Sequence, residues 1–236
     1  MNSARRQWLV GLSTLGAGAI LLGCKKTATS ESKEGTEAEV TATEDLMREH
    51  GILRRALLVY QETATRLNRG ALLPPEPLQK TAKLFRDFGE EYHEKKLEEV
   101  YIFPAVKKAG GPADSYADVL IVQHQRGREI TDFILAATAG PKVSTSNIKS
   151  FANALESLVR MYEHHAAIED TIVFPAWKQT LKPEDLDEMN GKFEEIEHEQ
   201  FGEDGFEKAL KQIAEIEQSL GLSDLTQFTA PSPPTA

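Results

Sequence analysis

The chain of 236 residues contains a single cysteine, Cys24, so no internal disulfide bond is available to it. One thiol also excludes a metal site built from a cluster of cysteines, and it excludes covalent heme attachment through a cysteine pair. Any metal ion in this protein must therefore be bound by nitrogen and oxygen ligands.

Clusters of basic residues are also lacking. The chain has 27 Lys and Arg against 37 Asp and Glu, a formal net charge of −10, and short pairs such as Lys107-Lys108 are its only basic groupings. An acidic protein of this kind matches neither the phosphate backbone of nucleic acid nor an anionic membrane surface. We therefore expect no nucleic-acid partner.

The sequence has no apolar run long enough for a clear membrane span. The longest one, from Trp8 to Leu22, is short and rich in glycine, follows a pair of arginines, and ends two residues before Cys24. Its start resembles a twin-arginine signal and its end resembles a bacterial lipobox, in which the cysteine is acylated. Residues 1–23 are thus predicted to be an export signal, with an uncleaved N-terminal anchor as the alternative.

Under this interpretation the mature protein begins at Cys24 and is a cell-envelope lipoprotein. It would face the periplasm and be attached to the membrane through its lipid alone. Loss of residues 1–23 removes two arginines and no acid, which moves the net charge from −10 to −12. Residues 24–43 have almost no large apolar side chains and are predicted to form a flexible tether.

Strand-like alternation is absent from the remaining sequence, and its periodicity is helical throughout. The predicted fold class is all-α: an up-down-up-down four-helix bundle over residues 44–182, with an additional C-terminal helical segment over 183–228. That segment is expected to break at Gly202 or Gly205. A proline-containing tail, residues 229–236, is predicted to be disordered.

Four of the six histidines lie on the apolar stripes of four different predicted helices: His50, His93, His124 and His165. Glu169 follows the last of these by four residues, one helical turn, so both side chains face the core. Glu98 follows His93 by five residues, and a π-bulge between them would restore the same alignment. A buried carboxylate is costly unless it is paired or bound to a cation, so this pattern predicts a metal site.

A weak internal repeat favours two metal ions over one. Glu98-Glu99 and Phe103-Pro104-Ala105 recur 71 residues later as Glu169-Asp170 and Phe174-Pro175-Ala176. In a bundle with approximate two-fold symmetry, the two corresponding helices would each present one bridging carboxylate. Imidazole and paired carboxylate ligands suit iron, manganese or zinc, and bridging of two iron ions in particular.

The chain resembles a hemerythrin-like, HHE-type four-helix domain over roughly residues 44–228. The motifs that carry the resemblance are Glu49-His50, Tyr92-His93-Glu94, Glu98-Glu99, Gln123-His124, Met161-Tyr162 with His165, and the two Phe-Pro pairs, together with Glu197-His198-Glu199 and the stretch from Phe201 to Glu207, which resembles the C-terminal element of an exported bacterial subgroup. The family implies a non-heme di-iron centre that binds dioxygen or a related small molecule. Carried over, the resemblance implies two iron ions with His50, His93, His124 and His165 as terminal ligands and Glu98 and Glu169 as bridges.

Some positions depart from the family pattern. Arg128 stands where oxygen-carrying hemerythrins have a second histidine in the third helix, so one iron is expected to be short of a ligand. Glu94 is an alternative to His93 or Glu98 as a ligand, and Asp170 is a further possible ligand. His164 corresponds to His93 by the repeat, whereas His165 fits the helical stripe better.

His198 and Glu203 keep a five-residue spacing that resembles a ligand pair, although they lie outside the four bundle helices. They are therefore additional possible ligands, with a surface or capping role as the alternative.

The resulting functional prediction is a di-iron protein of the cell envelope that binds or reacts with dioxygen, nitric oxide or peroxide, or handles iron. Two alternatives remain. A ferritin-like di-metal oxidase is suggested by Glu90-x-x-His93 and Glu195-x-x-His198. A metal-free helical scaffold lipoprotein is the other, and metal analysis would separate it from both di-metal interpretations.

Overall fold

A computed structural model describes residues 40–144, 146–202 and 204–234. The chain divides into two units, Met1–Val40 and Thr41–Ala236, and every described helix lies in the second. The predicted export signal, Cys24, most of the predicted tether and Glu203 lie outside the described residues.

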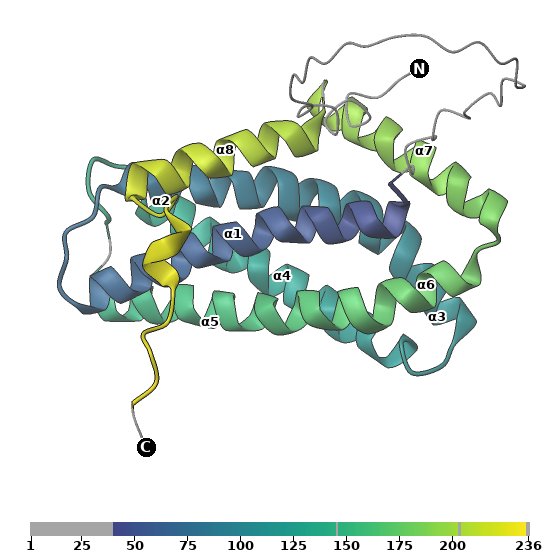
Figure 1. Cartoon of the computed structure of the whole chain (residues 1–236), viewed down its shortest axis with the longest axis horizontal. Helices are drawn as coiled ribbons and strands as arrows, with labels where there is room; N and C mark the ends of the chain where they lie inside the picture. Colours follow the sequence, from purple (N-terminus) through teal and green to yellow (C-terminus); the bar gives the residue numbers. More distant parts are fainter. Residues whose placement is uncertain (1–39, 145, 203, 235–236) are drawn as a thin grey trace, which may run out of the picture. The chain divides into compact units, whose positions relative to one another are not determined.

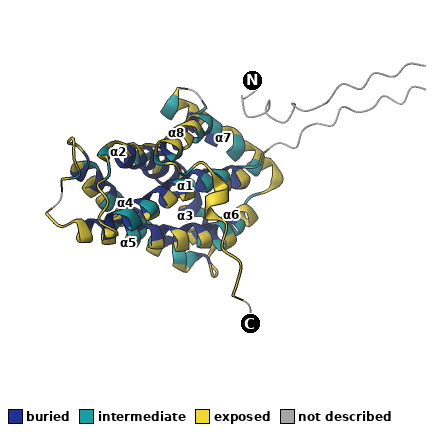
Figure 2. Ribbon diagram, turned by 60° about the vertical axis from the view of Figure 1, so that its left-hand side comes forward, coloured by how far each residue is buried: buried dark blue, intermediate teal, exposed yellow. Residues whose placement is uncertain are grey.

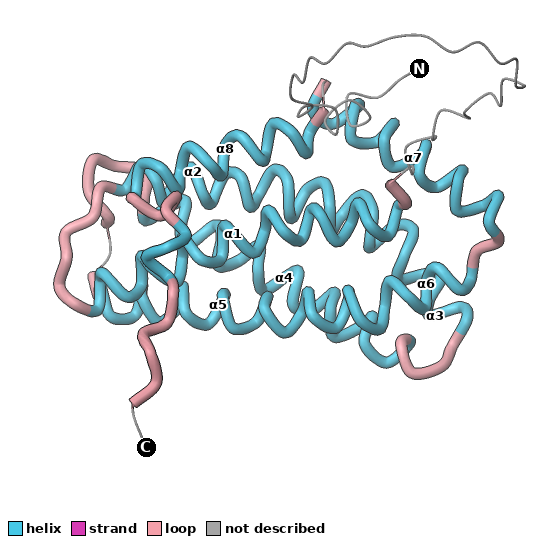
Figure 3. The backbone as a smooth tube through the Cα atoms, viewed as in Figure 1, coloured by secondary structure: helices cyan, strands magenta, loops and turns pink. Residues whose placement is uncertain are grey.

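The described residues form helices and no strand, so the all-α prediction is confirmed (Figure 3). In chain order the elements are α1 (Ala42–Asn68), α2 (Pro75–Leu84), η2 (Phe85–Ile102), α3 (Phe103–Ala109), α4 (Asp114–Ala137), α5 (Ile148–Ile168), η3 (Glu169–Val173), α6 (Phe174–Thr180), α7 (Pro183–Phe201), α8 (Gly205–Leu220) and η4 (Leu225–Phe228). None of these helices is long and apolar enough to cross a membrane.

The helices pack as a bundle in which successive long stretches run in opposite directions (Figure 1). α1 is the first stretch, and α2, η2 and α3 follow one another without a break as the second. α4 is the third, and α5, η3 and α6 form the fourth. The predicted helical bundle is therefore present, with α7 and α8 as the C-terminal addition.

The first helix begins at Ala42, two residues before the sequence-based domain boundary. Thr41 and Glu44 form a reciprocal capping box, in which the Thr41 hydroxyl accepts from the Glu44 amide and the Glu44 carboxylate accepts from the Thr41 amide. This arrangement satisfies two backbone donors at the helix start. The Thr-x-x-Glu pattern was the signal for this boundary.

Two π-helical segments interrupt the long helices, and both lie at the acidic residues of the repeat. In η2 the amide of Phe103 donates to the carbonyl of Glu98, and in η3 the amide of Phe174 donates to the carbonyl of Glu169. The predicted irregularity between His93 and Glu98 is thus confirmed. It extends over the 18 residues of η2, and η3 is a second one that the sequence analysis did not predict.

The Phe-Pro pairs explain why the wide turns occur at these places. Pro104 and Pro175 each lie one residue inside the α-helix that follows a π segment. Proline cannot donate a backbone hydrogen bond and its ring crowds the carbonyl four residues earlier, so the helix widens before it. The repeated sequence therefore produces a repeated distortion of the backbone.

The contacts that hold the C-terminal helices to the bundle include aromatic packing and an ion pair. Phe193 of α7 stacks on the buried Trp177 with ring centroids 5.7 Å apart, and Phe201 packs edge-on against Tyr92. Arg55 of α1 donates from Nε to the Glu217 carboxylate of α8 at 2.8 Å. α7 ends at Gly202, which is left-handed with φ of 69°, and this is one of the two predicted break points.

The buried face of every bundle helix points inward (Figure 2), and in α4 this face contains a glycine that makes room for a tyrosine. A Cβ atom on Gly127 would overlap the Tyr162 hydroxyl oxygen. That hydroxyl donates to Glu94 at 2.7 Å, so a larger residue would force the tyrosine away from its acceptor.

Gly127→Ala is expected to destabilise the protein by about 1–3 kcal/mol because the new methyl group overpacks the core. The matched control is Gly191→Ala in α7, where a Cβ meets nothing within 4 Å. That control should gain about 0.5–1 kcal/mol from helix propensity. Urea unfolding of both variants measures the difference, and an equal effect of the two would contradict the packing argument.

Candidate metal centre

Six polar side chains from four successive helical stretches meet in the middle of the bundle. His50 comes from α1, His93 and Glu98 from η2, His124 from α4, His165 from α5, and Glu169 is the first residue of η3. All six are at most 3% exposed. The structure thus brings together the six residues that the sequence analysis put forward as principal ligands.

On one side of this centre, two histidines face one oxygen of each carboxylate. His93 Nε2 lies 3.2 Å from Glu98 Oε1, and His50 Nε2 lies 4.0 Å from the same oxygen. His50 Nε2 is also 3.5 Å from Glu169 Oε2. The atoms of His50, His93 and Glu98 are close enough together to hold a metal ion.

The other side mirrors this arrangement with the remaining carboxylate oxygens. His124 Nε2 lies 3.3 Å from Glu98 Oε2, and His165 Nε2 lies 3.0 Å from Glu169 Oε1. These four residues also form a group that could hold a metal ion. Each carboxylate therefore turns one oxygen to each pair of histidines, which is the arrangement that a bridge between two ions requires.

The outer nitrogen of every histidine has an acceptor on a neighbouring helix. His50 Nδ1 lies 2.7 Å from Asp170, His93 Nδ1 2.6 Å from Glu49, His124 Nδ1 2.9 Å from Glu99, and His165 Nδ1 2.9 Å from the Gln123 amide oxygen. A histidine that donates from Nδ1 leaves a lone pair on Nε2, and such outer acceptors orient metal-binding histidines. All four Nε2 atoms are thereby turned to the centre as potential ligands.

The atoms at the centre cannot all be satisfied by one another. His124 Nε2 and His165 Nε2 are 3.1 Å apart, and with both protons on Nδ1 these nitrogens present lone pairs to each other. His93 Nε2 and all four carboxylate oxygens of Glu98 and Glu169 are buried without a hydrogen-bond partner. Only added protons or a cation can compensate such a group of buried acceptors.

The electrostatics of the centre agree with this description. Burial opposes a charge on His93, but the carboxylates of Glu98 and Glu49 outweigh it and raise its pKa well above the usual value. Burial likewise opposes a charge on Glu98, and His93 and His124 nonetheless hold its pKa well below the usual range. The pKa of His124 is raised to about 10, because nearby carboxylates outweigh its burial. The acids thus remain ionised and require positive charge beside them.

Glu94 and Arg128 lie next to the centre and bind each other. Arg128 donates to Glu94 at 3.1 Å and to Glu99 at 2.6 Å, while Glu94 accepts from Tyr162 on its other oxygen. Glu94, Glu99 and His124 are a third group with ligand-like spacing, but the guanidinium of Arg128 already forms ion pairs with both acids. Arg128 therefore acts as an ion-pair partner at the position where a further histidine was expected from the resemblance.

Two of the remaining candidate ligands point away from the centre. His164 and His198 are exposed on α5 and α7, and neither is in a group of described residues that could hold a metal. Asp170 contacts the centre only through His50 and also binds Arg54. His165, rather than its neighbour His164, is the one whose ring is buried.

The Glu-x-x-His pairs that suggested a ferritin-like site do not form one. Glu90 is buried but lies beside Arg86 and Thr131, at 2.8 and 2.6 Å, and Glu195 is exposed on α7. Neither acid occurs with a histidine in the metal-competent groups of the described residues. The structure thus gives these two motifs no common site.

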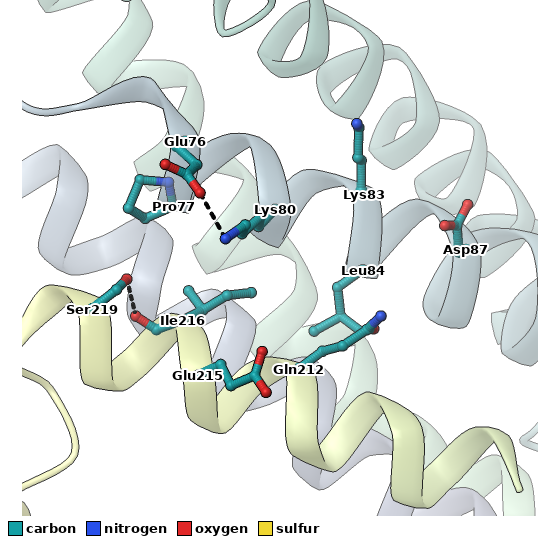
Figure 4. A pocket seen from close by; sticks show the side chains of 10 residues that line it. All are labelled: Glu76, Pro77, Lys80, Lys83, Leu84, Asp87, Gln212, Glu215, Ile216 and Ser219. Carbon is teal, nitrogen blue, oxygen red and sulfur yellow. Dashed lines mark hydrogen bonds and ion pairs between the residues drawn. The ribbon is translucent and has the colours of Figure 1, made fainter.

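A larger groove lies elsewhere, between α2 and α8 (Figure 4). Its volume for a water-sized molecule is about 370 Å³, against about 10 Å³ for the cavity at the histidines. It is lined by residues such as Lys80, which pairs with Glu76 at 2.7 Å, and by no histidine. Size therefore does not identify the site here, because the reactive and unsatisfied groups are at the small cavity.

The sequence analysis did not assign the role of outer acceptor to any residue, and it put forward one of the four, Asp170, as a possible metal ligand. Each of the four is the chain neighbour of one of the six central residues: Glu49 precedes His50, Gln123 precedes His124, Glu99 follows Glu98 and Asp170 follows Glu169. A polar residue beside a core histidine or carboxylate was the available signal. This signal does not predict which histidine each acceptor hydrogen-bonds, because that depends on how the helices pack.

Glu90 provides a test that is separate from the metal-binding residues. Burial raises the pKa of Glu90 to about 7, despite the opposing effects of Thr131 and Arg86. The folded protein therefore keeps a proton that the unfolded chain releases above about pH 4.5, so stability is lost as the pH rises from about 4.5 to about 7. At about 1.4 kcal/mol per pKa unit, this loss is on the order of 3 kcal/mol.

Glu90→Gln is expected to remove that loss, so the free energy of unfolding of the variant should fall less between pH 5 and 8 than that of the wild type. Denaturant unfolding of metal-free protein measures both profiles. The exposed Glu129→Gln is the control and should follow the wild type. Parallel profiles for wild type and Glu90→Gln would show that Glu90 is ionised throughout.

Comparisons with known proteins agree with this geometry. A family model described as the hemerythrin HHE cation binding domain matches residues 41–177. Uncharacterized proteins of Mycobacterium bovis and of two strains of Mycobacterium tuberculosis are each 40% identical to the chain over 232 residues, which is 95% of this chain and 90% of theirs. Their similarity thus includes α7 and α8, and no solved structure matches. The chain belongs to the hemerythrin HHE cation-binding domain family.

Proposed function

We propose that this protein binds two iron ions, with His50 and His93 as ligands of one and His124 and His165 as ligands of the other. Glu98 and Glu169 would bridge the two ions. The observation that carries this proposal is the group of buried acceptor atoms at the centre, in which four carboxylate oxygens and one imidazole nitrogen have no hydrogen-bond partner. Two cations would compensate these atoms without protonating them.

The ligand set supports iron. One half of the centre offers His124 and His165 with oxygens of Glu98 and Glu169, and the other offers His50 and His93 with an oxygen of Glu98. Glu169 Oε2 lies 3.5 Å from His50 on that second side, and neither half contains sulfur. Two histidines with a carboxylate are typical of non-heme iron sites that keep open coordination positions. Such iron would supply the redox chemistry and the open positions for a small ligand.

The cavity beside the centre supports a ligand of very few atoms. It has about 10 Å³ of space for a water-sized molecule, close to the minimum that holds one water. We therefore propose that the protein binds or reacts with dioxygen or a related small molecule, such as nitric oxide or peroxide. An organic substrate, as in the ferritin-like alternative, would need a larger cavity than the one beside the centre.

The protein's own residues would orient the centre and keep water from it. The outer acceptors fix the ring orientation of all four histidines, as in other metal sites with such partners. Phe174 and Phe103 stack on His50 and His124, with ring centroids 5.3 and 5.5 Å apart. These rings exclude water from two sides of the centre.

For its location, we propose a lipoprotein of the cell envelope, attached to the membrane at Cys24 and facing the periplasm. The support is in the sequence: a pair of arginines, a short apolar run, and a lone cysteine directly after Leu21-Leu22-Gly23. This part of the proposal is independent of the metal centre.

Iron analysis of protein purified in air tests the proposed centre. We expect two iron ions per chain and visible absorption bands that change when azide is added, because azide is a small ligand for open iron positions. Protein without iron, or with a heme Soret band instead, would exclude the di-iron proposal.

In the same assay, His124→Ala is expected to lose at least half of the iron, because His124 is one of two histidines on its side of the centre. His164→Ala is the matched control, since this exposed histidine of the same type lies on α5 beside His165. It should retain the wild-type iron content. Full iron content in His124→Ala would contradict the ligand assignment.

Mass spectrometry of the protein from a bacterial membrane fraction tests the location. We expect a chain that starts at Cys24 and carries lipid, whereas Cys24→Ser should yield no lipid-modified product. An unmodified chain that retains residues 1–23 in the wild type would contradict the lipoprotein proposal.

A further inference from the structure

The cavity at the centre has an identifiable wall toward the surface. Besides three of the histidines and the bridging acids, its lining residues are Leu53, Arg54, Leu57, Glu94, Tyr162 and Ala166. Three of these come from one side of α1 and two come from α5, and these two helices lie side by side (Figure 1). The cavity therefore extends between α1 and α5.

Residues of this wall are slightly more exposed than the aromatic residues that stack on the histidines. Leu53 and Ala166 are 6% and 7% exposed, whereas Phe103 and Phe174 on other sides are at most 1% exposed. The side chain of Arg54 is 43% exposed, and every other lining residue is buried. Arg54 is therefore the lining residue that is most accessible to solvent.

Arg54 places a positive charge at this point on an otherwise acidic protein. The chain has a net charge of −10, which repels anions in general. Asp170 is the partner of Arg54 and also accepts from His50, so the arginine is tied to the centre through one carboxylate. Without the arginine, the wall would present the charge of Asp170 alone.

We propose that Arg54 forms the ligand entrance and makes it favour small anions over cations. This inference rests on the proposed function, since it assumes a ligand that enters the iron centre. It adds the route and the charge of that ligand. Leu53 and Ala166 close the wall and so limit the size of the ligand that can enter, and the guanidinium of Arg54 favours a ligand with negative charge.

The test compares an anionic and a neutral ligand. In iron-loaded Arg54→Gln, we expect azide to associate about tenfold more slowly than in the wild type at low salt, with a weaker dependence on ionic strength. Nitric oxide, which is uncharged, should associate at the wild-type rate. Arg54→Lys should restore most of the azide rate, because it restores the charge.

The matched control is Arg55→Gln, which removes the same charge from the next position of α1. Arg55 binds Glu217 of α8 and does not line the cavity. Azide association in this variant should equal that of the wild type. A decrease in the azide association rate as large as in Arg54→Gln would show that the effect comes from net charge and would overturn the proposed entrance.

A second measurement uses metal-free protein, and here Arg54→Gln is expected to raise a rate rather than lower it. Ferrous ions are cations, so their uptake should be faster in Arg54→Gln than in the wild type if they enter by the same route. Damage to the fold would instead slow both azide and iron. Slower iron uptake, an unchanged azide rate, or an equal loss for nitric oxide would each overturn the proposal.

Different results would overturn the proposed di-iron function and the proposed entrance at Arg54. A wild-type protein that takes up no iron would overturn the proposed function and this inference with it. Normal iron content and normal azide binding, with azide association rates that are unchanged in Arg54→Gln, would overturn only the proposed entrance.

Discussion

The structure depends on two carboxylates, Glu98 and Glu169, that are ionised and fully buried in the middle of a helical bundle. An acid in this position costs several kcal/mol unless positive charge is beside it. Four histidines from four different helical stretches surround the pair and supply either protons or ligand nitrogens. The centre is thus a place in the described core where buried polar atoms without hydrogen-bond partners gather, four of them carboxylate oxygens.

The hydrogen bonds behind the histidines connect the helices in a closed ring. Glu49 of α1 accepts from His93 of η2, Glu99 of η2 from His124 of α4, Gln123 of α4 from His165 of α5, and Asp170 of η3 from His50 of α1. Each helical stretch gives one acceptor and receives one donor. A shift of any helix along its axis would break two of these bonds, so the register of the bundle and the geometry of the centre are specified by the same contacts.

Much of this could be predicted from the sequence, because it depends on local spacing. The helical periodicity indicated the fold class, and core positions of the helices brought six residues into one centre. The five-residue step from His93 to Glu98 indicated a π-helical turn, and one is present. The turn at Glu169 was missed because a four-residue step from His165 already fits a regular helix. The partners of the histidines, the pairing of Arg128 with Glu94, and the position of Glu90 depend on packing between helices, which spacing along one helix does not determine.

The closed ring of hydrogen bonds also has a consequence for how folding and metal binding are related. Its four hydrogen bonds join only atoms of the chain, so the ligand nitrogens are oriented without the help of an ion. In many small metal-binding domains the chain gains its order only when the metal arrives. Here the four histidine rings have hydrogen-bond partners within the chain, so part of the ordering cost is met by contacts other than metal ligation. The helices that carry the ligands are joined to one another by these same contacts, so the orientation of the ligands and the association of the helices are coupled.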